Sequence, residues 1–198
     1  MKYTQVPSDL FKKIQINAGI IVSAFEPETG AITATNILMA TSGGCSFSAE
    51  PSFTDFGEDI DNVPKNTMEL KEIESIEVKL SGTAVTMDTT QAKSFMAAAD
   101  VAGNKVTPRA DLKAEDFKDI WWIGDYSDEN SGDSAGFIAI KIMNALSTGG
   151  FKIKSDDKSK GNFDFEYTGH YSIKNAETVP YEVYIKTGGA AEEVKHKI

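Results

Sequence analysis

The residues best placed for catalysis lie in an alternating polar and apolar stretch from Gly161 to Ile173. On an extended strand, Asp164 and Glu166 share one face about 7 Å apart. Two carboxyl groups near each other are the acid and base of glycoside hydrolysis. The polar His170 shares that face. The same spacing is typical of the wet face of a long antiparallel strand, and this structural interpretation is the favoured one.

Other residues suited to chemistry lack the partners that the chemistry needs. Cys45 is the only cysteine, so it predicts no internal disulfide, and it is interpreted as a small, partly buried residue. The acidic segments 57–61 and 125–133 do not have the spacing of a calcium loop and are interpreted as solvated turns. The adjacent Trp121 and Trp122 can stack on a sugar or base, but a strand position favours the core. No metal site or cofactor site is predicted.

The charge of the chain excludes one large class of function. The 198 residues carry 20 Lys and Arg against 30 Asp and Glu, a net charge of -10. No Lys or Arg lies between Lys13 and Lys65, so the first third of the chain is strongly acidic. Such a surface repels nucleic acid phosphates, because binding them requires clustered cations. Tight binding to DNA or RNA is therefore not expected.

The length predicts one domain, over residues 1–187, followed by a flexible C-terminal tail at 188–198. The segment Met1–Pro7 lacks the apolar stretch of a signal peptide, and the apolar runs are too short to span a bilayer. No membrane association is therefore expected.

The elements that carry these residues are predicted to be mainly strands. Period-two alternation predicts strands over 13–25, 45–53, 72–87, 120–123, 137–146, 151–154, 162–173 and 181–186. One amphipathic helix is predicted over Thr89–Ala102, with Asp88 as its N-cap and Gly103 at its end. The succession of strands predicts a mainly β fold, an antiparallel sandwich or barrel with one flanking α-helix.

One long segment, Thr54 to Leu70, fits neither a helix nor a strand. Segments of this length without regular structure are uncommon in a compact domain and are usually functional. Its apolar side chains would be wasted in solvent, so we expect the segment to dock on a partner. The predicted contact residues are Phe53, Asp55, Phe56, Glu58, Asp59, Ile60, Asp61, Val63, Pro64 and Met68.

Several stretches of the chain resemble the major tail proteins of phages that infect Gram-positive hosts. The resemblance extends from about Ile14 to Lys186. The stretches that carry it are Phe53–Thr67, Asp119–Tyr126, Asn144–Phe151, Phe165–Tyr171 and Val179–Tyr184.

This resemblance implies a structural tail tube protein and not an enzyme. In that family a β-sandwich or barrel is flanked by a helix, and hexameric rings stack into a tube through which DNA passes. The inner strands of all copies form one continuous barrel, and the long loop reaches the next ring. The implied partners are further copies of the chain and other tail proteins, such as the tape measure, tail terminator and baseplate or tip proteins. The implied location is the virion tail, assembled in the host cytoplasm.

The resemblance also assigns roles to particular elements. The tube wall is expected to contain strands 45–53, 72–87, 137–146 and 162–173, with the helix outside it. Glu77, Lys79, Asp164 and Glu166 are the predicted lumen-facing residues. Two other classes stay open. One is a carbohydrate- or partner-binding β-sandwich that uses Trp121, Trp122 and Tyr126, and the other is a hydrolase built on Asp164 and Glu166.

Overall fold

The computed structural model describes residues 14–126 and 136–187 of the chain. These residues form a mainly β fold with one α-helix, α1 (Thr89–Phe95). Short 3-10 turns lie at Ala34–Asn36, Met68–Leu70 and Ala114–Asp116. The strands in the described ranges are β1 (Gln15–Val22), β2 (Ile37–Met39), β3 (Thr41–Asp55), β4 (Lys71–Ala84), β5 (Ala99–Ala102), β6 (Lys105–Pro108), β7 (Lys118–Tyr126), β8 (Phe137–Ser147), β9 (Phe163–Gly169) and β10 (Tyr181–Lys186).

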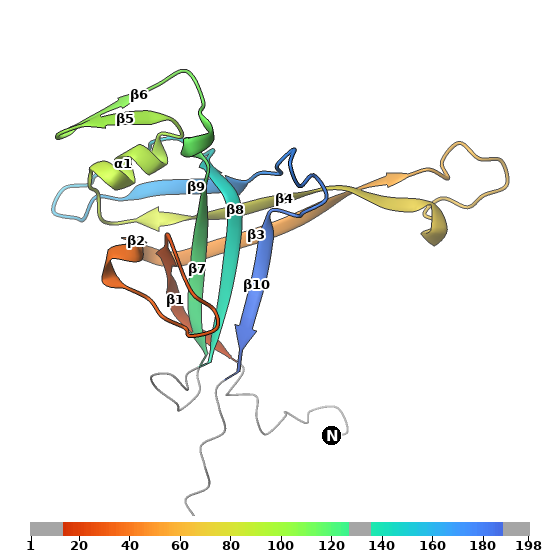
Figure 1. Ribbon diagram of the computed structural model, residues 1–198, viewed down its shortest axis with the longest axis horizontal. Coiled ribbons are helices and arrows are strands. Elements are labelled where there is room, and N and C mark those ends of the chain that lie inside the picture. Colours follow the sequence, from red (N-terminus) through yellow and green to blue (C-terminus); the bar gives the residue numbers. More distant parts are fainter. Residues whose placement is uncertain (1–13, 127–135, 188–198) are drawn as a thin grey trace, which may run out of the picture.

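The main sheet is antiparallel, with strand order β2-β1-β7-β8-β9-β4-β3 and with β10 paired to β8. Strand β8 belongs to two layers. Residues 137–142 pair with β7 and β10, whereas Leu146 and Ser147 pair with β9. Ala145 still pairs with Lys118 of β7, and Asn144 just before it has a left-handed φ of 48°, which asparagine tolerates better than most residues. In Figure 1, β7, β8 and β10 cross β3, β4 and β9, so the sheet folds into a sandwich-like arrangement and not a closed barrel.

The core lies between these layers and is built by the predicted alternation. On β4, Val78 and Leu80 are buried, and on β9 Phe165 and Tyr167 are buried. The ring of Phe95 from α1 stacks on Phe165 with centroids 5.9 Å apart. Burial of each side chain of this size contributes roughly 1.5–3 kcal/mol to the free energy of unfolding, so a few such residues hold the helix on the sheet.

The prediction of a helix over Thr89–Ala102 is wrong in its second half. Helix α1 begins as expected, because Asp88 accepts a hydrogen bond from the backbone of Gln91 in a capping box. It ends at Phe95, and Ala97 takes a left-handed φ of 59°. Residues 99–102 then pair with 105–108 as a hairpin. The turn at Gly103 therefore connects the two strands of this hairpin and does not end a helix.

The strand predicted over 162–173 is also too long at its end. Strand β9 stops at Gly169, and the backbone N–H of His170 donates to Met143 on β8. Beyond that point Ile173 is 98% exposed, so it does not share the buried face predicted for it. The predicted strand over 151–154 is reduced to a single bridge between Lys154 and Asn162. The predicted strands around β3, β4, β7, β8 and β10 are confirmed, with shifted ends.

Candidate assembly surfaces

The most unusual surface is a two-stranded arm that projects from the body (Figure 1). Strands β3 and β4 stay paired out to Asp55 and Lys71, whereas β9 stops pairing with β4 at Val78. The arm, defined here as residues 49–77, therefore has no third strand in the described structure. The hydroxyl of Tyr171 accepts a hydrogen bond at 2.9 Å from the backbone N–H of Ile76 at the root of the arm.

The arm tip, defined as residues 55–70, is an ordered turn, organised by one carboxylate. The Oδ1 atom of Asp55 accepts from the backbone N–H of Gly57, and Oδ2 accepts from that of Asn66, both at 2.9 Å. These two bonds hold the pKa of Asp55 below its ordinary value. Gly57 is buried against Val63 and Leu70. The tip therefore presents a defined shape and not a loose loop.

The predicted contact residues form the outer surface of this arm. The exposed fractions are 50% for Phe53, 58% for Phe56 and 47% for Ile60, and Met68 reaches 80%. Val63 differs from the others, because it is half-buried against the tip itself. The remaining predicted residues Glu58, Asp59, Asp61 and Pro64 are exposed. The arm therefore exposes four large apolar side chains, as the sequence predicted.

A second surface, the polar face, brings together all four predicted lumen residues. In the register of the sheet, Ser81 pairs with Glu166 and Thr83 with Asp164, which places these carboxylates on the face that carries Glu77 and Lys79. The rest of the polar face is rich in hydroxyl groups, from Ser46, Ser48, Ser52, Ser75, Thr148 and Thr168. The side chains opposite this face form the core.

The carboxylates of the polar face already have local partners. Thr83 donates to Asp164 at 2.8 Å, and Thr148 donates to Glu166 at 3.1 Å. Glu77 forms an ion pair with Lys79 at 2.6 Å, which raises the pKa of Lys79. A hydrolase acid would instead need a desolvated environment that raises its pKa. This geometry therefore gives the hydrolase interpretation no support.

The two tryptophans of the binding-module interpretation have partners within the protein, and Tyr126, at the end of β7, is half-buried. Trp121 is 6% exposed and packs against Phe25 and Tyr184, with ring centroids 5.6 and 5.4 Å away. Trp122 is half-buried, and its indole N–H donates to the carbonyl of Ala18 at 3.2 Å. A sugar platform requires an open aromatic face. The core interpretation of Trp121 is confirmed.

The cysteine and the histidine in the described structure also have structural surroundings. Burial raises the pKa of Cys45, against the opposing effect of a hydrogen bond with Thr41, so the thiol is a poor nucleophile. His170 Nδ1 lies 3.2 Å from the carbonyl oxygen of Asn144, and Phe117 packs edge-on against its ring. No group of three metal-ligating side chains occurs in residues 14–126 and 136–187. Most of the acidic turn at 125–133, and the tail at 188–198, lie outside the described residues.

A charged cluster that was not predicted from the sequence surrounds Arg109, the only arginine in the chain. Its Nη2 donates to both oxygens of Asp116, at 2.7 and 2.9 Å, and its Nε lies 3.0 Å from Asp100. The side chains of Arg109 and Asp116 are only 10% and 1% exposed. The cluster fastens the β5–β6 hairpin to the 3-10 turn before β7. Its one available signal was that the arginine is alone in a lysine-rich chain.

No family model and no curated protein matches this chain. Within the described ranges, none of the helices has the length and apolar character that crossing a membrane demands.

Proposed function

We propose that this chain is the structural subunit of a phage tail tube, without a catalytic role. Hexameric rings would stack so that their joined inner strands form a channel for DNA. The resemblance in sequence suggests the family, and the observation that carries the proposal is the projecting arm with its ordered, apolar tip. A monomeric protein gains nothing from such a surface, whereas a subunit that stacks on copies of itself needs one.

The edges of the sheet support self-assembly. Strand β3 is 15 residues long and pairs only with β4 in the described structure. Strand β10 likewise pairs only with β8. Long edge strands present unpaired N–H and C=O groups, which soluble proteins normally cover or shorten. Closing a ring would pair such edges between neighbouring copies.

The polar face suits the wall of a channel for DNA. Its side chains are mostly hydroxyls and carboxylates, with Glu50, Glu77, Asp164 and Glu166 against Lys79 and the neighbouring Lys152. Carboxylates oppose the binding of phosphates, and hydroxyls keep the surface wet without adding positive charge. DNA would then pass without being held. The other partners in this proposal are the tape measure, tail terminator and baseplate or tip proteins of a virion tail assembled in the host cytoplasm.

The experiment is electron microscopy of the purified protein with and without its arm tip. In the matched variant an Asn-Gly turn replaces residues 55–71 and connects Thr54 to Glu72. These two residues pair in register, so a two-residue turn can join them. Lys105→Ala, on β6, serves as the control. We expect rings or striated tubes with an open axis for the native protein and the control, and folded but unassembled subunits for the shortened arm. Tubes formed by the shortened variant, or a glycan-binding protein that stays monomeric, would contradict the proposal.

A further inference from the structure

A cleft of about 350 Å³ opens between α1, β2 and the adjoining parts of β7 and β8. Its apolar lining includes Ile37, Met39, Ile120 and Ala145. Binding sites for small molecules range from roughly 300 to 1,000 Å³, so this cleft lies at the small end. It is large enough for one or two side chains of a partner.

The lining of the cleft carries two ammonium groups and two carboxylates. The two carboxylates there are already engaged, because Asp88 caps α1 and Asp116 binds Arg109. Lys93 and Lys118 also line the cleft, and neither forms a salt bridge within the described ranges. Lys118 therefore remains available to a partner, whereas the Lys93 ammonium also acts on the nearby carboxylate of Asp116 and helps to lower its pKa.

The arm tip has the complementary character. Phe56 and Met68 are its most exposed apolar side chains, and they can fill a cleft of this size. The tip also carries the exposed carboxylates of Glu58, Asp59 and Asp61, which outnumber the single lysine of the tip, Lys65. These three carboxylates form no salt bridge in the part of the chain that the structure describes. An apolar tip with an excess of acidic residues can therefore match an apolar cleft whose lining includes Lys93 and Lys118.

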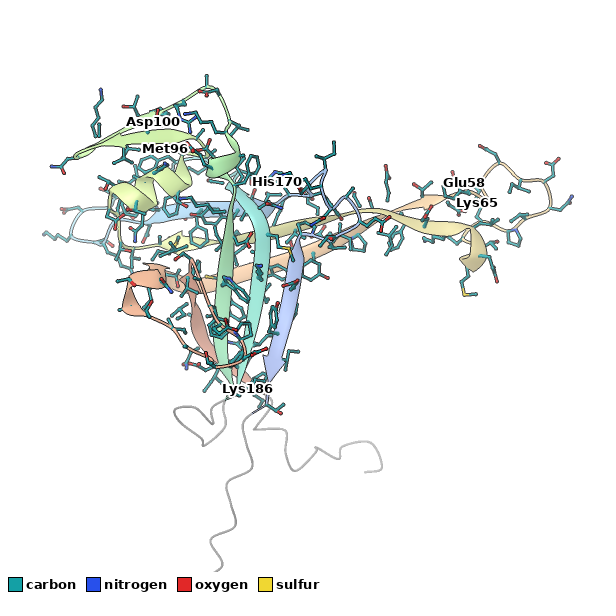
Figure 2. All side chains as sticks on the ribbon, viewed as in Figure 1. Glu58, Lys65, Met96, Asp100, His170 and Lys186 are labelled. Atoms are coloured by element: carbon teal, nitrogen blue, oxygen red, sulfur yellow. The ribbon has the colours of Figure 1, made fainter. Side chains whose placement is uncertain are left out.

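The tip and the cleft lie at opposite ends of the molecule. Figure 2 shows Glu58 and Lys65 at one end of the long axis, and Met96 next to α1 towards the other. The arm therefore cannot reach the cleft of its own chain. Contact between two different surfaces of identical subunits leaves a free tip and a free cleft on every pair, so the contact repeats into a ring or filament.

We propose that the arm tip of one copy docks in the α1–β2 cleft of another copy. Phe56 and Met68 enter the apolar cleft, while the acidic residues of the tip face Lys93 and Lys118. This inference rests on the proposed self-assembly and names the two surfaces that meet. It does not require that the assembly be a tube.

The direct test is disulfide trapping between two variants in a Cys45→Ser background. One carries Met68→Cys in the tip and the other Thr90→Cys, an exposed position on α1 that lines the cleft. After mixing and mild oxidation, peptide mapping measures the 68–90 link. Docking raises the local concentration of the two thiols, so we expect this link at about tenfold or more above a control pair that uses Lys105→Cys instead of Thr90→Cys.

A second variant blocks the cleft without altering the arm. Thr90→Trp fills its mouth and is expected to weaken self-association by about tenfold, whereas the control Lys105→Trp, on β6 and outside the cleft, leaves it unchanged. If tubes form without the 68–90 link, or if the Thr90→Trp variant assembles normally, the docking proposal is wrong while the tail tube proposal still stands. A 68–90 link in particles that lack an axial channel would support the docking and contradict the tube.

Discussion

Replacing Arg109 by methionine is expected to destabilise the protein by about 3 kcal/mol, because it leaves the carboxylate of Asp116 buried without its cation. Methionine keeps much of the aliphatic volume, so packing is little changed. The cost comes from charge, since the Asp116 side chain is 1% exposed and accepts two hydrogen bonds from the guanidinium.

The magnitude follows from the surroundings of each partner. Removing one member of a buried ion pair costs roughly 3–5 kcal/mol, whereas an exposed pair contributes about 0–1 kcal/mol. Asp100 and Asp111 are 64% and 68% exposed, so their pairs with Arg109 add little. Asp116 also keeps a bond from the backbone of Lys113 at 2.9 Å, which places the loss at the lower end.

The assay is urea and thermal unfolding of the native protein, Arg109→Met, and the double variant Arg109→Met/Asp116→Leu. For a chain of this size the expected loss lowers the melting temperature by roughly 6–12 °C. The double variant should recover most of it, since an apolar pair can replace a buried ion pair at little cost. Arg109→Lys should be intermediate, because an ammonium group cannot bind both carboxylate oxygens as the guanidinium does.

The pH dependence provides an independent check. The backbone N–H of Lys113 and the guanidinium of Arg109 hold the pKa of Asp116 below its ordinary value, despite burial. A depressed pKa means that the stabilisation is complete above about pH 4 and is lost as pH falls through the pKa of the folded state. Arg109→Met should lose stability less steeply with acid. A loss below about 1 kcal/mol together with an unchanged acid slope would refute the buried-pair reasoning.

Three further outcomes are expected. Asp55→Asn should speed amide exchange in the arm tip without lowering the melting temperature of the body, and the native tip should loosen as pH falls below about 4, because the pKa of Asp55 is depressed. Tyr167→Phe should cost about 1–2 kcal/mol in unfolding experiments, since it removes the buried 2.6 Å bond to Ser94. Burial also raises the pKa of Tyr167, so only the native protein should lose this contribution as pH rises above about 10. Gly19→Ala should cost about 2 kcal/mol or more, because φ is 70° there and a Cβ would lie 2.5 Å from the carbonyl oxygen of Ile123; an unchanged melting temperature would contradict this.

The parts of the fold that the sequence predicts well are those set by local patterns. Alternation on 78–84 and 163–169 predicts which side chains enter the core and which form the polar face, because successive side chains of a strand point to opposite sides. The start of α1 is equally local, since Asp88 caps its own chain three residues ahead. The exposed apolar residues of the arm tip were likewise identified from their types alone.

Where helix propensity and strand pairing compete, the sequence prediction fails. The alanines at 97–99 favour a helix, but a Gly-Asn turn at 103–104 lets residues 99–102 pair with 105–108. The arginine after that hairpin then anchors it through a carboxylate seven residues away. Such pairings depend on which segments meet in space, and period alone does not report them.

The sequence by itself thus determined the β class, the buried and polar faces of the strands, and the exposed apolar residues of the arm tip. Only the tertiary structure decided that β3 and β4 extend beyond the end of β9 and project as an arm. Where a sheet loses a strand depends on the point at which the neighbouring strand stops pairing, and this is not encoded in the pattern of β3 or β4 alone. The same holds for the cleft beside α1, whose walls come from 23–39, 88–97 and 116–120 and from β8 and β9. A surface assembled from separated segments has no signature along the chain, since it exists only once those segments pack together.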